Sequence, residues 1–262
     1  MFKYILLLVI LVTGVLVTLN TQLTLSSREA REKENQRPAE IELITLVPTS
    51  CDSCVDVNQL LESIQKQNVQ ISSDKQFTAD SEEAKTLIST YQLTRVPSVL
   101  VRGEMEKETV RSFFETLGRK ADDGTLVIEP SLPVYFDIAQ NKVVGEVTIT
   151  TLFDATCKEC YDPAIHQSIL KTNFGLTITK TESLDAADAQ GKKYVQRYAI
   201  KELPTFLLSG DVTAYDSITK IWETVGTVEQ DGTFVFRGNK ELNGLVYKDI
   251  STQMIIKPET KE

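Results

Sequence analysis

Apolar and polar positions along residues 41–250 follow two alternating patterns. Short runs of β-branched and other apolar residues predict strands, the first at Ile41–Val47 and a similar one at Val147–Phe153. Each run is followed by apolar residues at helical spacing, which predict an amphipathic helix. These residues are Val57, Leu60, Leu61 and Ile64 after the first run and Ile165, Ile169 and Leu170 after the second. Strands that alternate with helices predict an α/β fold, a sheet with parallel crossovers and helices on its faces.

The chain matches itself when it is displaced by 106 to 112 residues. Five segments match in order: 41–51 with 147–157, 91–101 with 198–208, 115–118 with 223–226, 123–128 with 231–236, and 135–138 with 247–250. The offset only increases along the chain, as expected if short loop insertions separate two copies of one unit. The sequence therefore predicts a tandem duplication, with a first copy at residues 41–138 and a second copy at residues 139–262.

Each copy continues through a second strand and a second helix to a strand that opens at a proline. The second strands are predicted at 69–72 and 176–181, and Pro97 and Pro204 open the later strands. The acidic stretch 80–85 predicts a helix start capped by its own Asp or Ser side chain. One helical face near the end of the second copy carries Ile218, Ile221, Trp222 and Val225, which predicts a core position for the tryptophan.

The first 25 residues are far more apolar than the rest of the chain. No charged residue occurs between Lys3 and Arg28, and the apolar run reaches the length of about 20 residues that a membrane-spanning helix needs. Lys3 on the amino side favours a cytoplasmic amino terminus. We predict a single-pass signal-anchor helix at 1–25 and a polar linker at 26–40, with the remainder extracytoplasmic. A cleaved signal peptide, which would give a secreted protein, is the alternative.

Composition and charge exclude several kinds of function. The 262 residues suffice for two domains of about 100 residues each. A net charge of −9 without a basic cluster argues against nucleic acid as a partner. No Gly-rich phosphate loop, Ser–His–Asp set or nucleotide fingerprint is present, so no cofactor is predicted. His166 is the only histidine and is expected to be an ordinary packed or surface residue of a helix.

All four cysteines fall into two C-x-x-C motifs, each directly after the first predicted strand of a copy. The motifs are Cys51–Cys54 and Cys157–Cys160, and an extracytoplasmic compartment permits disulfides. In a C-x-x-C motif directly after a strand, we expect the first cysteine at the amino end of the next helix, where unpaired backbone N–H groups and the helix dipole favour its thiolate. We predict that Cys51 and Cys157 attack a substrate disulfide and that Cys54 and Cys160 resolve the mixed disulfide.

The order strand, C-x-x-C, helix, strand, helix and proline-led strand resembles the thioredoxin fold. Cys54 and Pro97 are 43 residues apart, and Cys160 and Pro204 are 44 apart. Over nearly all of residues 41–250 the chain is similar to tandem thioredoxin-fold disulfide oxidoreductases and isomerases. The resemblance implies two domains, each with a central mixed sheet and flanking helices, and an enzyme acting on protein thiols and disulfides. It also implies a recycling partner, cis peptide bonds before both prolines and a substrate groove lined by Val96, Pro97, Leu203 and Pro204.

The motifs depart from the thioredoxin pattern in their neighbours. Asp-Ser and Lys-Glu stand between the cysteines in place of Gly-Pro, and Thr45 and Thr151 replace the buried acid. Nearby carboxylates such as Asp154 would oppose a thiolate, whereas Lys158 would favour one. Pro163 would either kink a helix that begins at the second motif or be the first residue of a helix that begins at Asp162. In the second case Cys157 loses much of the stabilisation by a helix terminus, which favours the first pair as the better redox centre.

Two alternatives to an enzyme stay open. The disulfides could be structural ones in a non-catalytic thioredoxin-fold scaffold that binds partners. Four thiolates could also hold zinc or copper, but the 102 residues between the motifs far exceed the spacing of a zinc ribbon. Metal binding is therefore not the prediction. The pattern also leaves open whether the exchange is oxidation, reduction or isomerisation.

Overall fold

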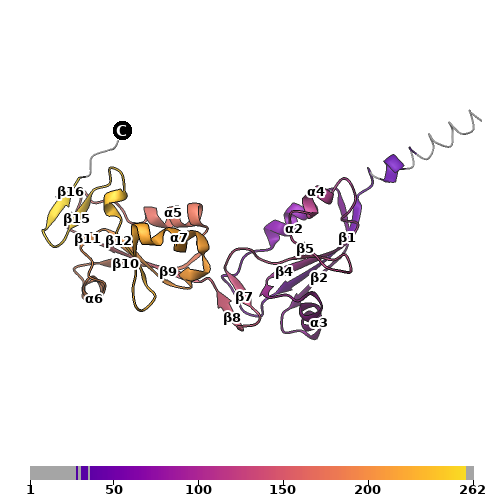
Figure 1. Ribbon diagram of the computed structural model, residues 1–262, viewed down its shortest axis with the longest axis horizontal. Helices are drawn as coiled ribbons and strands as arrows, with labels where there is room; N and C mark the ends of the chain where they lie inside the picture. The colour runs from indigo at the N-terminus through magenta and orange to yellow at the C-terminus, as the bar shows by residue number, and fades with distance from the viewer. Residues whose placement is uncertain (1–27, 29–30, 35, 258–262) are drawn as a thin grey trace, which may run out of the picture. The chain divides into compact units, whose positions relative to one another are not determined.

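A computed structural model describes residues 28, 31–34 and 36–257 of the chain (Figure 1). The predicted anchor at 1–25 lies outside these residues. Within the described part of the chain, no helix has the length and apolar character needed to cross a membrane. Residues 31–34 are helical, and the first strand, β1, already begins at Ala39, inside the predicted linker.

Two five-stranded sheets repeat one topology. In the first the strand order is β2-β1-β4-β6-β5, and in the second it is β10-β9-β12-β14-β13. The first consists of β1 (Ala39–Val47), β2 (Val69–Thr78), β4 (Ser98–Gly103), β5 (Arg119–Lys120) and β6 (Leu126–Ile128). The second consists of β9 (Val147–Phe153), β10 (Ile178–Asp185), β12 (Thr205–Gly210), β13 (Gly226–Val228) and β14 (Phe234–Phe236). Both begin in the same element order, so the sheets support the tandem duplication.

Pairing in the second sheet is mixed, as predicted. β9 and β10 are parallel, whereas β12 is antiparallel to both β9 and β14. A parallel pair needs a crossover, and α5 (Ile165–Phe174) lies between β9 and β10 in the chain. The other helices of this copy are α6 (Ala189–Arg197) and α7 (Asp216–Val225), with short 3-10 turns at Val212–Ala214 and Asn239–Glu241.

The second sheet has a hydrophobic cluster on each face. Alternation along β12 directs Phe206 and Leu208 to the cluster that includes Trp222 of α7 and residues of α5, whereas Leu207 joins the cluster against α6. In Figure 1, α5 and α7 accordingly lie on one side of this sheet and α6 on the other. Trp222 is 1% exposed, so its predicted core position is confirmed.

The helices of the first copy are α2 (Asn58–Gln65), α3 (Glu82–Tyr91) and α4 (Arg111–Phe114). Ile64 of α2 and Phe114 of α4 pack with alternate residues of β1 and β4. The predicted cap of α3 is confirmed for one candidate, because Ser81 Oγ accepts a hydrogen bond from the Ala84 N–H at 3.2 Å.

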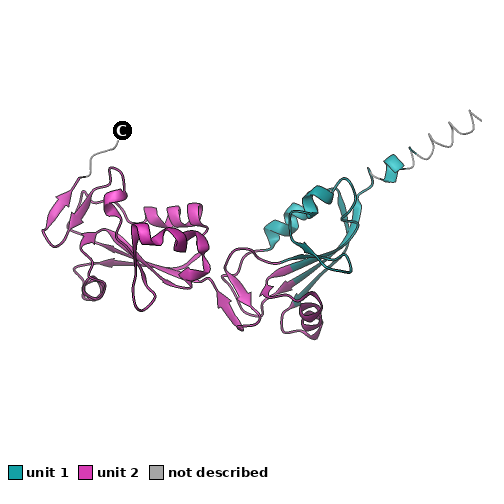
Figure 2. Cartoon of the chain, in the orientation of Figure 1, with its two compact units in different colours: residues 1–45, 57–77, 99–128 teal, residues 46–56, 78–98, 129–262 magenta. Residues whose placement is uncertain are grey.

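Figure 2 colours two compact units of the chain. One comprises residues up to 45 with 57–77 and 99–128, and the other comprises 46–56, 78–98 and 129–262. The boundary between the copies at residues 138 and 139 rests on the sequence repeat and stays a prediction.

Two small sheets were not predicted from the sequence. The strand orders are β3-β7-β8 and β11-β15-β16. The first consists of β3 (Arg95–Val96), β7 (Tyr135–Asp137) and β8 (Lys142–Val144), and the second of β11 (Glu202–Leu203), β15 (Tyr247–Asp249) and β16 (Met254–Ile256). In each copy, the end strand of the small sheet contains the residue before the proline.

Candidate active site

Each C-x-x-C motif forms a disulfide. The Cα atoms of Cys51 and Cys54 are 5.4 Å apart, and those of Cys157 and Cys160 are 5.5 Å apart. All four side chains are half-buried. In the described residues no group of three or more His, Cys, Asp or Glu side chains could hold a metal ion.

The prediction that Cys51 and Cys157 lie at the amino end of a helix is wrong, and in the second copy the alternative of a helix that begins after the cysteines is the one observed. α2 begins at Asn58 and α5 at Ile165, beyond the second cysteine of each motif. Instead, the backbone N–H of the residue after each motif is hydrogen-bonded to the carbonyl of the residue just before β7 or β15. The Val55 N–H donates to the Val134 carbonyl at 2.8 Å, and the Tyr161 N–H donates to the Val246 carbonyl at 2.9 Å. The residues just before β7 and β15 therefore anchor the two cysteine loops.

This geometry removes the reason for preferring the first cysteine pair. A helix terminus favours a thiolate only within its first turn, and neither attacking cysteine lies there. Pro163 precedes α5 instead of interrupting it, and Asp162 Oδ1 accepts the Ala164 N–H at 2.9 Å. A helix terminus therefore gives neither cysteine pair an advantage in stabilising its attacking thiolate.

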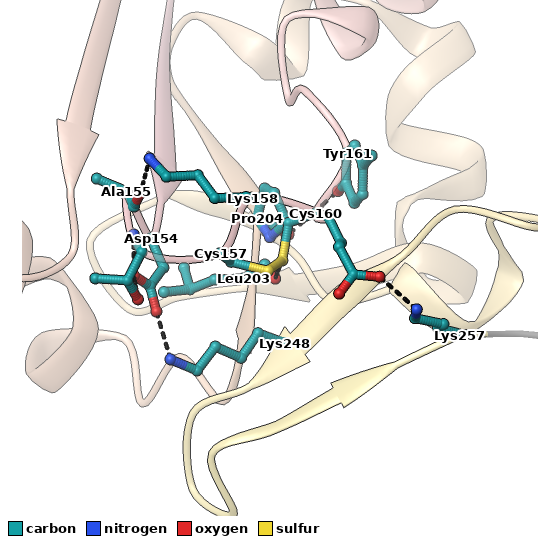
Figure 3. The surroundings of a disulfide bond; sticks show 12 residues. Asp154, Ala155, Cys157, Lys158, Cys160, Tyr161, Leu203, Pro204, Lys248 and Lys257 are labelled. Atoms are coloured by element: carbon teal, nitrogen blue, oxygen red, sulfur yellow. Dashed lines mark hydrogen bonds and ion pairs between the residues drawn. A yellow bond between two sulfur atoms is a disulfide. The ribbon is translucent and has the colours of Figure 1, made fainter.

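Both predicted cis peptide bonds are present, at Val96–Pro97 and Leu203–Pro204. In the second copy, the Cys160 Sγ lies 3.9 Å from the Leu203 carbonyl oxygen. Figure 3 shows the disulfide beside Leu203 and Pro204. The structure thus brings together the predicted catalytic and proline residues of this copy.

The predicted groove residues are less accessible than expected. Val96 and Leu203 are 0% and 1% exposed. Val96 lies opposite Phe136 in the antiparallel pair β3–β7, and Leu203 lies opposite Lys248 in β11–β15. The chain's own strands therefore occupy the backbone edge that the resemblance assigns to a substrate. Substrate binding by the four predicted groove residues stays a prediction, and it requires β7 or β15 to move aside.

A pocket of about 500 Å³ opens beside the second disulfide. Both cysteines, Pro204 and Tyr161 contribute to its lining. Thr151, at the position of the buried acid of thioredoxins, also lines the pocket and donates its hydroxyl to the Glu182 carbonyl at 3.3 Å. The pocket gives a reactant access to the sulfur atoms.

Two lysines neutralise carboxylates around the second motif (Figure 3). Lys248 Nζ lies 2.7 Å from Asp154 Oδ2, and Lys257 pairs with Glu159 inside the motif. Burial raises the pKa of Asp154, but hydrogen bonds from Lys248 and Thr156 outweigh it and hold that pKa at about 2. The carboxylates therefore oppose a thiolate less than the sequence alone implies.

A buried polar cluster lies next to Cys160. The Tyr161 hydroxyl is 3.0 Å from His166 Nε2, 2.9 Å from Asn239 Oδ1 and 3.1 Å from the Pro204 carbonyl oxygen. Asn239 Nδ2 donates to the same carbonyl at 3.0 Å. Burial lowers the pKa of His166 to about 4 and raises the pKa of Tyr161. His166 is 4% exposed, which confirms that it is a packed residue.

Sequence reasoning missed Tyr161, Asn239 and Lys248. A comparison of the copies could have drawn attention to two of them, because Val55 and Phe136 stand at the positions of Tyr161 and Lys248. Asn239 lies in the stretch 237–246, where the repeat offset grows from 108 to 112 and no residue of the first copy is matched to it. Differences between the copies therefore mark the special features of the second site.

Neither a protein-family model nor a curated protein matches the sequence. Similar solved structures include the NTD_N/C domain of the alkylhydroperoxide reductase AhpF from Enterococcus faecalis, at 15% identity over 70% of this chain and 90% of that chain, with a TM-score of 0.20. A protein disulfide oxidoreductase from Aeropyrum pernix is 16% identical over 70% of this chain and 82% of that chain, also with a TM-score of 0.20. ERdj5 is 11% identical over 72% of this chain and 26% of that chain, with a TM-score of 0.19.

These similarities are too low to transfer an activity. The chain's own features define its class: two five-stranded sheets of the same strand order with flanking helices, and in each copy a C-x-x-C disulfide and a cis-proline. They are consistent with two tandem thioredoxin-like domains.

Proposed function

We propose that the chain is a thiol–disulfide oxidoreductase that exchanges disulfides with protein substrates through its two C-x-x-C motifs. The observation that carries this proposal is the second disulfide, which lines an open pocket together with the cis-proline Pro204. A structural disulfide needs no such access. The repeat of motif and cis-proline in both copies supports the same chemistry for the first pair.

In the reductive direction, the Cys157 thiolate attacks one sulfur of a substrate disulfide and releases the other as a substrate thiolate. Cys160 then loses its proton and attacks the Cys157 sulfur, which releases the second substrate thiolate and closes the Cys157–Cys160 disulfide. The reverse sequence oxidises a substrate dithiol. Cys51 and Cys54 take the same roles in the first copy.

The Leu203 carbonyl supports this division of roles between Cys157 and Cys160. Its oxygen faces the Cys160 sulfur at 3.9 Å and can accept a hydrogen bond from a thiol there. A hydrogen bond to the neutral form disfavours ionisation. Cys160 is therefore held as the thiol, and Cys157 supplies the attacking thiolate.

A second candidate function is a non-catalytic binding scaffold whose disulfides stay closed. The paired backbone edges at Val96 and Leu203 favour it, because an extended substrate cannot add to an edge that β7 or β15 already occupies. An enzyme must either exchange disulfides through the pocket or displace β7 or β15, whereas a scaffold does neither.

For the location, we propose that residues 1–25 anchor the chain in a membrane and that the polar residues between this segment and β1 carry both copies on the extracytoplasmic side. The charge-free apolar segment at the amino terminus supports this placement. A membrane-impermeant maleimide added to intact, reduced cells should label the cysteines. Labelling only after the cells are lysed would contradict the placement.

Replacing each resolving cysteine by serine, as in Cys54→Ser and Cys160→Ser, is expected to trap mixed disulfides with substrates in cells. Without the resolving sulfur, the adduct on Cys51 or Cys157 cannot close the C-x-x-C disulfide and release its partner. The adducts are detected as high-mass species that disappear on reduction. The matched control lacks both cysteines of the motif and should trap nothing. Absence of reducible adducts with both trapping variants would favour the scaffold.

A further inference from the structure

The polar cluster beside Cys160 forms a directed chain of hydrogen bonds. His166 Nε2–H can donate to the Tyr161 hydroxyl oxygen, the Tyr161 O–H to Asn239 Oδ1, and Asn239 Nδ2–H to the Pro204 carbonyl. This order gives each of these donors one acceptor. Asn239 is 1% exposed, so a broken link would leave a polar group unpaired away from water. Tyr161 and Asn239 therefore link the His166 imidazole to the Pro204 carbonyl.

Tyr161 joins this chain of hydrogen bonds to the cysteine loop. It follows Cys160 directly, and its backbone N–H is held by the Val246 carbonyl at 2.9 Å. Its hydroxyl can donate to the Pro204 carbonyl at 3.1 Å, or to Asn239 Oδ1 at 2.9 Å and so reach that carbonyl through Asn239. Pro204 is bonded to Leu203, so fixing Pro204 also fixes the Leu203 carbonyl. That carbonyl lies 3.9 Å from Cys160 Sγ, so the contacts of Pro204, together with the pairing of β11 with β15, bear on this distance.

We propose that Tyr161 is a positioning residue for the second cysteine pair: through Asn239 and Pro204 it holds the Leu203 carbonyl against Cys160 and so stabilises the dithiol relative to the disulfide. This inference rests on the proposed exchange function. The reduced Cys160 carries a proton that the Leu203 carbonyl can accept, whereas a disulfide sulfur carries none. The hydrogen bond therefore forms only after reduction and makes reduction easier.

The first copy provides an internal comparison. Val55 stands at the position of Tyr161 and Leu60 at that of His166, so the first copy lacks both the hydroxyl and the imidazole. The tyrosine therefore distinguishes the second cysteine pair from the first within one chain. A change at Tyr161 should affect the equilibrium of the second pair alone.

The test is a redox equilibrium of the Tyr161→Phe variant of the 262-residue chain in mixtures of reduced and oxidised glutathione at pH 7. Reduction of either pair consumes two glutathione thiols and gives one glutathione disulfide, and alkylation with peptide mass spectrometry counts the thiols of each motif. Losing one hydrogen bond of the dithiol should shift the second pair about three- to tenfold toward the disulfide. A tenfold shift makes the midpoint about 30 mV more negative. The first pair should not change.

Two further variants separate positioning from folding. Tyr215→Phe removes another buried hydroxyl of the second copy, which donates to the Gly145 carbonyl at 2.7 Å. It should lower stability and leave the midpoint of the second pair unchanged. Asn239→Leu removes the link to the Pro204 carbonyl and should shift the midpoint in the same direction as Tyr161→Phe. It also keeps the proposal testable if Tyr161→Phe does not fold.

Equal midpoints of the second pair in the wild type and both Tyr161→Phe and Asn239→Leu would overturn the positioning role. An equal shift in Tyr215→Phe would do the same, because the effect would then be a general loss of packing. In either case, wild-type exchange would still stand. Wild-type midpoints below about −300 mV for both pairs would instead contradict the proposed function itself.

Discussion

Lowering the pH from 7 to 4 is expected to cost the second copy about 3 kcal/mol of its free energy of unfolding through His166. Burial among aromatic rings lowers the pKa of His166 from 6.5 to about 4. Above pH 6.5 the imidazole is neutral in both states, and the stability is fully present. Between pH 6.5 and 4 the unfolded chain binds a proton that the folded chain does not, so stability falls. Below pH 4 both states are protonated, and this loss goes no further.

His166 is the only histidine, so its imidazole gives one set of nuclear magnetic resonance signals that can be titrated directly. Denaturation at pH 7 and at pH 4.5, compared with the His166→Leu variant, isolates its share of the pH dependence. The His166→Leu variant carries the residue type found at this position in the first copy, and its stability should lack the part of the pH dependence that His166 causes. An imidazole that titrates near pH 6.5 in the folded protein would contradict the buried, neutral histidine.

Replacing Lys248 by methionine is expected to destabilise the second copy by about 2 kcal/mol at pH 7. Lys248 and Asp154 are each 14% exposed, so the substitution leaves a carboxylate largely shielded from water without its cation. The pKa of Asp154 should rise from about 2 toward or above its ordinary value of 3.8. Because the folded pKa is lowered, the wild-type advantage is present above pH 3.8 and is lost as the pH falls through about 2.

Urea denaturation of single and double variants measures this contribution. Asp154→Asn combined with Lys248→Met removes both charges and should recover part of the loss, because no uncompensated charge remains. Lys257→Met is the matched control, since its pair with Glu159 is more than half exposed and should contribute less than about 1 kcal/mol. Equal losses of stability in Lys248→Met and Lys257→Met would contradict a special role for the partly buried pair of Lys248 and Asp154.

Local patterns predicted the repeated elements well. The apolar run Val147–Phe153 became β9 with the same bounds, and the helical spacing around Ile165 became α5. Periodicity carries this information because a strand or helix that packs one face must repeat its apolar residues. The cis-prolines followed from the resemblance, which depends on spacing between motifs rather than on periodicity.

Long-range contacts decided what the sequence did not predict. The spacing of Val57 and Leu60 is the same whether the helix begins at the cysteines or at Asn58. The hydrogen bond from Val55 to Val134 holds the chain outside the helix before that point. Strands of two or three residues, such as β3 and β7, are too short to show a period.

The partly buried ion pair of Asp154 and Lys248 was missed for a related reason. Asp154 and Lys248 are 94 residues apart, and no local pattern connects them. Only the placement of β15 beside Leu203 brings the lysine to the cysteine loop. Chemistry that depends on the small sheets was therefore visible only in the structure.

The most direct test of thiol–disulfide exchange is a redox titration of the wild-type 262-residue chain, with the thiols of each motif counted by mass spectrometry. Exchange predicts that at least one pair has a midpoint between about −120 and −270 mV, the range of known exchange proteins. Midpoints below about −300 mV for both pairs would mean structural disulfides and would contradict the account.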